Sequence, residues 1–194
     1  MNTPLGPPRR LVILGPPGAG KGTQAKRLAG RLGVVHLSTG AMLRRAMDAG
    51  TEVGQLARPY VEAGELVPDD VMLGVVEHAL EAPEVVEHGF LLDGFPRTAE
   101  QAEAFLAAGP DRLDAAVQIA LGPEEARRRL LARGRGDDRP EVVDHRLAVD
   151  AEESGPLLSY LRAAGLLVEV DGAAGVDEVA DRIIEALFRL RDTN

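Results

Sequence analysis

The sequence predicts an α/β fold in which amphipathic helices surround a buried parallel β-sheet. Short runs of β-branched and other apolar residues alternate with longer amphipathic stretches along the 194 residues, which is typical of repeated βαβ units. A glycine-rich segment stands between the first apolar run and the first amphipathic stretch. Hydrophobic residues make up 45% of the chain and charged residues 27%, so one compact domain has enough apolar material to bury a core.

Five segments are predicted as strands because they are apolar on both faces, as central parallel strands are. In chain order they are residues 11–14, 34–37, 89–92, 115–121 and 166–170. The segment before them, residues 1–8, holds three prolines and a glycine, so we expect neither a helix nor a central strand there.

A helical pattern of about fifty residues separates the second and third strands, which is too long for one crossover helix. The pattern breaks at Gly50 and Gly64 and restarts at Pro68. A small helical lobe is therefore predicted over residues 38–67, followed by a helix that returns the chain to the sheet.

Two features are predicted nearer the C-terminus. A short charged turn separates a helix that ends near Arg133 from a helix that begins at Pro140. The last helix, residues 176–191, carries an apolar stripe from Val176 to Leu190, which we expect to pack on the sheet.

Charge and composition exclude several classes of protein. The chain has 22 basic and 31 acidic residues, a formal net charge of −9, which argues against a nucleic-acid or anionic-membrane partner. The absence of cysteine excludes disulfides, thiolate zinc sites and cysteine nucleophiles. The one early apolar run, Leu11 to Leu14, is too short for a membrane span or a signal peptide. We therefore expect a cytoplasmic protein.

The glycine-rich segment, residues 15–23, reads GPPGAGKGT. Its glycines let the backbone curl so that successive N–H groups point at phosphate oxygens, at the positive end of the following helix, while Lys21 reaches the β- and γ-phosphates. The residues predicted to bind a nucleoside triphosphate here are Gly18, Ala19, Gly20, Lys21, Gly22 and Thr23.

Magnesium is the cation expected with such a triphosphate, held through water. Gly22 stands where a Ser or Thr hydroxyl usually meets the metal, and Thr23 comes one residue late, so Thr23 is a weak candidate ligand. Asp93 ends the third strand, where such enzymes keep a carboxylate near magnesium, so we expect Asp93 to contact the ion through water.

Three further segments complete a pattern that resembles the adenylate kinase family. They are LSTGAMLR at 37–44, DGFPRT at 93–98 with Gln101 after it, and GRGDD at 134–138. The resemblance covers the chain from Arg10 onward. It implies a three-layer sandwich built on the phosphate-binding loop (P-loop), with a lobe that binds the nucleoside monophosphate (NMP) and a very short lid. The implied boundaries are 1–37, 68–131 and 140–194 for the core, 38–67 for the NMP-binding lobe and 132–139 for the lid.

The resemblance implies reversible phosphoryl transfer between MgATP and AMP, which gives two ADP, with Mg²⁺ and without zinc. A kinase for a nucleotide acceptor must neutralise two phosphate clusters in line with each other. Arg44 and Arg97 lie near the ends of the second and third strands, where sites in parallel sheets lie, and are expected to clamp the acceptor phosphate.

The family pattern implies a fuller set of site residues. Besides the phosphate loop, ATP is expected to meet Arg129, Arg133 and the backbone around Ala174. The expected catalytic residues are Lys21, Arg97, Arg133, Arg135 and Arg146, with Asp137 and Asp138 tying the lid to these arginines. The residues expected to bind AMP are Thr39, Gly40, Arg44, Glu65, Leu66, Val67, Gly94, Arg97, Gln101, Arg135 and Arg146.

This chain departs from the family pattern in two places. Ala41 stands where the family usually has an aspartate that helps to hold the waters of magnesium, so Asp93 is hypothesised to carry more of the metal contact. The lid is shorter than the family's usual short form, which predicts measurable ATP hydrolysis without AMP. The four histidines, at positions 36, 78, 88 and 145, show no metal-ligand spacing and no paired acid, and no general base is expected.

Two alternatives stay open from the sequence. The same kind of enzyme could take CMP or UMP as acceptor, or the chain could be a regulatory P-loop ATPase that signals by shape. No segment indicates a dimer interface, so a monomer is expected.

Overall fold

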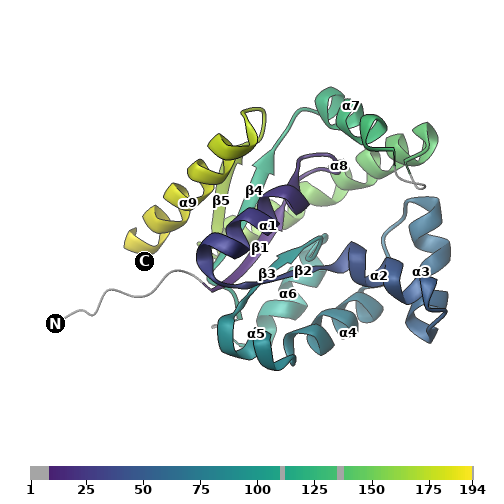
Figure 1. The fold of residues 1–194 in the computed structure, drawn as a ribbon, viewed down its shortest axis with the longest axis horizontal. Helices are drawn as coiled ribbons and strands as arrows, with labels where there is room; N and C mark the ends of the chain where they lie inside the picture. Colours follow the sequence, from purple (N-terminus) through teal and green to yellow (C-terminus); the bar gives the residue numbers. More distant parts are fainter. Residues whose placement is uncertain (1–8, 110–111, 135–137, 194) are drawn as a thin grey trace.

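The computed structural model describes residues 9–109, 112–134 and 138–193. Five parallel strands form one sheet in the order β2-β3-β1-β4-β5 (Figure 1). Their bounds are β1 Arg10–Leu14, β2 Val35–Ser38, β3 Phe90–Asp93, β4 Ala115–Ala120 and β5 Leu167–Asp171. All five predicted strands are confirmed, with ends that differ by one residue.

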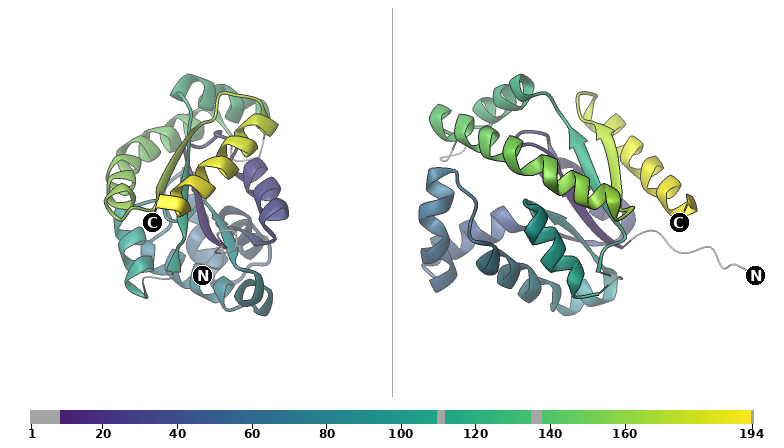
Figure 2. Two further views of the ribbon diagram at one scale, coloured as in Figure 1. Left: turned by 90° about the vertical axis from the view of Figure 1, so that its left-hand side faces the viewer. Right: turned by 180° about the vertical axis from the view of Figure 1, so that it is seen from behind.

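Helices cover both faces of the sheet, so the three-layer architecture is confirmed. Helices α1 and α9 lie on one face, and α6 and α8 lie on the other (Figures 1 and 2). The helices are α1 Lys21–Leu32, α2 Thr39–Asp48, α3 Glu52–Ala63, α4 Asp69–Leu80, α5 Pro83–His88, α6 Ala99–Ala107, α7 Pro123–Arg133, α8 Pro140–Ala163 and α9 Val176–Thr193.

The core has two halves because successive strand side chains point to opposite faces. Leu11 and Ile13 of β1 pack in the half that includes α1 and α9, whereas Val12 and Leu14 pack in the other half. In that second half Phe95 meets the ring of Phe105 edge to face, at 5.7 Å between ring centres. This packing fixes the position of the segment that follows β3, which forms part of the cavity described below.

The prediction that every strand is apolar on both faces is wrong for β5. Its residues alternate, with Val168 and Val170 buried and Glu169 exposed, since β5 lies at the edge of the sheet. Glu169 accepts a hydrogen bond from Arg162 of α8 at 2.9 Å. The apolar stripe of α9 is buried as predicted at Val179, Ala180, Ile183 and Leu187, but its first member, Val176, is 45% exposed.

The segment between β2 and β3 is helical and breaks where predicted. Gly64 ends α3 with φ 85°, a left-handed conformation that suits glycine. The return to the sheet uses two helices, α4 and α5, rather than the single one expected. Across the described ranges, no helix is both long and apolar enough to cross a membrane.

Candidate active site

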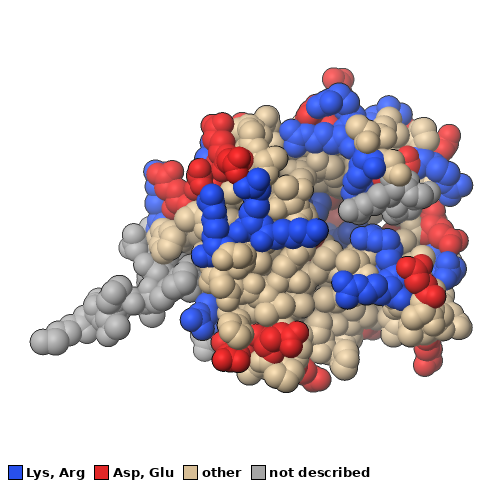
Figure 3. Space-filling model, viewed as in Figure 1, with Lys and Arg blue, Asp and Glu red and all other residues tan. Residues whose placement is uncertain are grey.

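A large open cavity lies at the carboxyl ends of β1, β2 and β3. Its volume is about 1030 Å³, and its walls come from the phosphate loop, from α2 and the end of α3, from the segment after β3, and from α7 and α8. Parallel sheets bind ligands at this edge because the loops that follow adjacent strands meet there. Figure 3 shows basic side chains bordering the hollow between the α7 and α2 parts of the molecule.

The phosphate loop has the shape that its glycines predict. Gly18 has φ 89°, and a Cβ there would lie 2.5 Å from the carbonyl oxygen of Ala126 in α7, so only glycine fits. Lys21 begins α1, and its Nζ donates to the carbonyl oxygens of Gly15 at 2.5 Å and Pro16 at 3.0 Å. The ammonium therefore already lies over the loop that is to hold phosphates.

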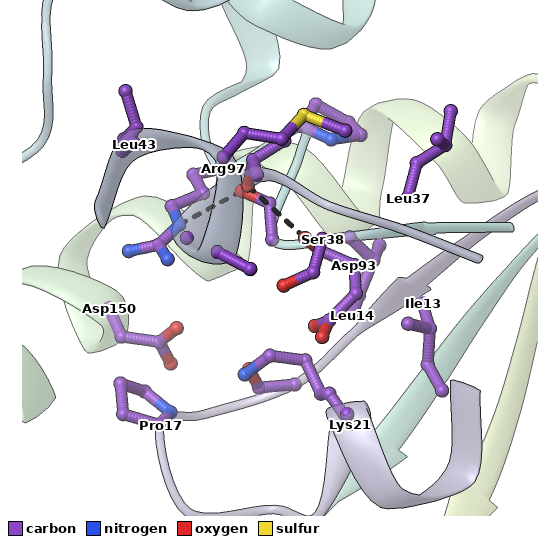
Figure 4. Close-up of a pocket in the computed structure, with 18 of the residues that line it drawn as sticks. Ile13, Leu14, Pro17, Lys21, Leu37, Ser38, Leu43, Asp93, Arg97 and Asp150 are labelled. Atoms are coloured by element: carbon purple, nitrogen blue, oxygen red, sulfur yellow. Dashed lines mark hydrogen bonds between the residues drawn. The ribbon is translucent and has the colours of Figure 1, made fainter. Parts of the chain in front are cut away.

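Four charged side chains face the middle of the cavity: Lys21, Asp93, Arg97 and Asp150 (Figure 4). Burial lowers the pKa of the Lys21 ammonium to about 8; Arg97 adds to this effect, and Asp93 and Asp150 oppose it. Arg97 is exposed to the solvent of the cavity, but the cavity walls enclose its guanidinium and lower its pKa. Two basic and two acidic side chains thus face one another in a cavity that is partly shielded from water.

Asp150 is not among the site residues predicted from the sequence. Its carboxyl group, on α8, is half-buried, and burial raises its pKa while Lys21 and Arg97 oppose that rise. No basic side chain in the described part of the chain comes within ion-pair distance of it. Asp150 follows Arg146 by four residues, which places both on one face of α8, and this spacing was the signal available in the sequence.

The arrangement around Asp93 fits a water-coordinated magnesium ion. A Cβ on Gly22 would lie 3.3 Å from Asp93 Oδ2, so the carboxylate flanks the phosphate loop at the residue that lacks a hydroxyl. Among the described residues no group of three or more His, Cys, Asp or Glu side chains forms a metal cage. A cation here would need water and substrate phosphates to complete its shell, as Mg²⁺ prefers.

His36 lies next to this carboxylate. Its Nε2 is 3.7 Å from Asp93 Oδ2 and is buried without a hydrogen-bond partner. The expectation of no paired acid is therefore wrong for His36. It is also wrong for His145, whose Nε2 lies 2.6 Å from Glu65 Oε1. Both pairs join residues far apart in the sequence, which linear spacing does not reveal.

The predicted arginines of α7 and α8 meet near the cavity. Asp138 accepts two hydrogen bonds from Arg133, at 2.9 Å and 2.6 Å, and lies 3.8 Å from Arg146. Arg146 also donates to the carbonyl oxygen of Val61 at 3.2 Å. Arg129 lies on the same side of α7 and lines the cavity with Arg133. The predicted role of Asp138 as a tie to the arginines is confirmed, while Arg135 and Asp137 lie outside the described residues.

Among the described residues, those expected to bind AMP lie at the other end of the cavity, apart from Arg146 on α8. The buried Thr39 hydroxyl donates to the carbonyl oxygen of Asp93 at 3.1 Å, which joins the start of α2 to the end of β3. The Arg44 guanidinium folds back over Gly40, and Arg97 Nε donates to the carbonyl oxygen of Gly94 at 3.1 Å. Also lining the cavity are Glu65, Leu66, Val67 and Gln101.

Two predicted ATP-binding residues do not line the cavity. The side chain of Ala19 is buried in the core, and Ala174 packs against the same core cluster. The neighbouring carbonyl oxygen of Gly172 accepts hydrogen bonds from Arg129 at 3.4 Å. The segment around Ala174 therefore meets an arginine of the site, but it does not form part of the cavity wall.

Comparison with known proteins agrees with this geometry. The family model described as adenylate kinase matches residues 13–166. The chain is 45% identical over 185 residues to the adenylate kinase of Stenotrophomonas maltophilia strain K279a, covering 92% of this chain and 98% of that protein. It is also 45% identical over 183 residues to the adenylate kinase of Mycobacterium sp. strain MCS, covering 93% and 99% respectively.

Proposed function

The chain belongs to the adenylate kinase family and transfers a phosphoryl group reversibly between ATP and AMP, and we propose that the cavity is where this transfer takes place. The observation that carries the proposal is one cavity with the phosphate loop at one end, Gln101 at the other, and basic side chains between them. Its volume lies at the upper limit for small-molecule sites, which suits two nucleotides bound together.

ATP is proposed to bind at the phosphate loop. The backbone N–H groups from Gly18 to Thr23 face its phosphates, and Lys21 exchanges its contacts with the loop carbonyls for the β- and γ-phosphates. Arg129 and Arg133 approach from α7. The proposal also keeps the backbone around Ala174 as a contact to the base, outside the cavity wall.

AMP is proposed to bind between α2 and the segment after β3. Arg44 and Arg97 clamp its phosphate, since guanidinium groups bind phosphate oxygens in pairs. The backbone of Glu65, Leu66 and Val67 and the Gln101 amide face the adenine. Thr39, Gly40 and Gly94 shape this end of the cavity.

Charge neutralisation and alignment are sufficient for the chemical step. A phosphate oxygen of AMP attacks the γ-phosphorus of ATP as the bond from that phosphorus to the β–γ bridging oxygen breaks, which leaves two molecules of ADP. The acceptor is already ionised, so no base has to remove a proton. Lys21, Arg97, Arg133, Arg135 and Arg146 are proposed to stabilise the charge that the moving phosphoryl group spreads over its oxygens.

Magnesium, when bound with ATP, neutralises charge on the β- and γ-phosphates. Asp93 is proposed to hold the ion through water, with the Thr23 hydroxyl as a weaker contact. Because Ala41 supplies no carboxylate, Asp93→Asn should raise the magnesium concentration needed for half-maximal turnover. Unchanged magnesium dependence in this variant would remove Asp93 from the metal site.

The remaining assignments follow from the same proposal. Residues 38–67 form the lobe that closes on AMP, 132–139 form the lid, and the rest forms the core. The protein acts as a monomer in the cytoplasm, where ATP and AMP are both present. A lid this short excludes water incompletely, so slow ATP hydrolysis without AMP is expected.

The direct test measures ADP formation from MgATP with AMP, CMP, UMP or no acceptor. Two ADP per ATP consumed, with AMP preferred, is the expected outcome. Arg97→Ala should lower kcat/KM by about a hundredfold or more. The matched control is Arg128→Ala, because Arg128 is 69% exposed and pairs with Glu125 on its own helix. Transfer to CMP or UMP alone, or hydrolysis without any transfer, would refute the assignment.

A further inference from the structure

The side-chain amide of Gln101 is held at both of its ends. Its Oε1 accepts a hydrogen bond from the backbone N–H of Arg97 at 2.7 Å, and its Nε2 donates to Asp69 Oδ1 at 2.6 Å. Gln101 is only 3% exposed, yet it lines the end of the cavity assigned to AMP. Asp69 stands behind it, in the first turn of α4, and is not part of the cavity wall.

These two partners permit one orientation of the amide. An ionised carboxylate only accepts hydrogen bonds, and a backbone N–H only donates. Turning the amide by half a revolution would set its oxygen against the Asp69 carboxylate and its NH₂ group against the N–H of Arg97. Both contacts would repel, and the amide of Gln101, a residue only 3% exposed, would lose both of its hydrogen bonds.

The fixed orientation leaves one N–H and one oxygen lone pair of the amide for a ligand. A 6-aminopurine offers an amino donor beside a ring-nitrogen acceptor, and an amide pairs with both. A 6-oxopurine offers a carbonyl acceptor beside a ring N–H donor in the same two positions. The oxygen of the fixed amide would then face the 6-oxo oxygen, and its N–H would face the ring N–H, so neither hydrogen bond could form. An amide free to turn would pair with either base.

We propose that Asp69 is a positioning residue that sets the specificity for the acceptor base, by locking the Gln101 amide in the orientation that accepts 6-aminopurine monophosphates and rejects 6-oxopurine monophosphates. The inference rests on the proposed function, in which Gln101 faces the base of AMP. The Asp69 carboxylate supplies the stronger of the two locks because it is charged. The N–H of Arg97 supplies the other.

The experiment compares AMP with inosine monophosphate (IMP), whose base carries the 6-oxo group, at saturating MgATP. The variant is Asp69→Asn, which keeps the shape of the side chain but lets it donate as well as accept. The matched control is Asp70→Asn, because Asp70 is the next residue in the same helix turn and is exposed like Asp69, but Gln101 donates its hydrogen bond to Asp69. The readout is the ratio of kcat/KM for AMP to kcat/KM for IMP.

The ratio should fall in Asp69→Asn, by only about tenfold because the hydrogen bond from Arg97 remains. It should stay unchanged in Asp70→Asn, where both hydrogen bonds of the amide remain. A purely structural role for Asp69 would lower both kcat/KM values and leave the ratio unchanged, which would overturn the inference. Asp69→Ser, whose hydroxyl also donates and accepts, gives the same test if Asp69→Asn does not fold. Failure of the wild-type protein to phosphorylate AMP would instead overturn the proposed function.

Discussion

Raising the pH above 8 is expected to weaken ATP binding to the free enzyme, because the pKa of Lys21 is lowered to about 8. The ammonium is then half protonated at pH 8, and only about a tenth of it stays cationic one pH unit higher. A neutral lysine side chain still donates hydrogen bonds to phosphate, but it lacks the electrostatic attraction of the ammonium ion. The apparent affinity for ATP should fall by up to about tenfold for each pH unit above this pKa.

Two kinetic parameters separate this effect from a general loss of activity. kcat/KM for ATP reports groups of the free enzyme and should fall above pH 8, whereas kcat reports the complex. In the complex the phosphates stabilise the ammonium and raise the pKa of Lys21, so kcat should stay level over the same range. A level kcat/KM profile, or an equal fall in kcat, would refute the reasoning.

A single substitution should move the pH profile. Asp150→Asn removes a negative charge that raises the pKa of Lys21, so the fall in kcat/KM should begin at lower pH. The matched control is Asp144→Asn, because Asp144 also lies on α8 but is exposed and pairs with Arg127 outside the cavity. An identical shift in both variants would show that net charge, rather than the facing carboxylate, sets the pKa.

Three further predictions concern stability and the arginine cluster. Burial raises the pKa of Asp150, so its ionisation opposes folding; Asp150→Asn should raise Tm near neutral pH, and the gain should vanish as the pH falls below about 3.9, which thermal melts at several pH values would reveal. Asp138→Ala removes the two hydrogen bonds between Asp138 and Arg133 and should raise KM for ATP by about tenfold, with steady-state kinetics as the check. Gly18→Ala forces a Cβ to within 2.5 Å of the Ala126 carbonyl oxygen at a positive φ and should cost more than about 1 kcal/mol in urea unfolding; an unchanged midpoint would contradict the close approach.

The sequence predicted those parts of the site that depend on neighbours along the chain. The glycine loop could be recognised because its strand, glycines, lysine and helix are consecutive, and Arg44 and Arg97 because each follows a strand end. Arg129 and Arg133 could be paired by their spacing on one helix. In each case one strand or one turn of helix carries the whole signal.

The pairings across the fold could not be predicted in this way. The hydrogen bond between Asp69 and Gln101 joins α4 to α6, and the contact between Glu65 and His145 spans 80 residues. In the sequence Asp69 only begins a helix, and Glu65 only follows a glycine. Which side chain each of them meets depends on how the helices pack after the chain has folded.

The sequence by itself determined the strands, the phosphate loop and the position of its lysine, because hydrophobic periodicity and backbone conformation are local properties. Only the tertiary structure decided that β5 is an edge strand, that Asp150 faces Lys21 and Arg97, and that burial lowers the pKa of Lys21 to about 8. The physical reason is that burial and electrostatic interaction depend on distances through space, which packing sets and spacing along the chain does not.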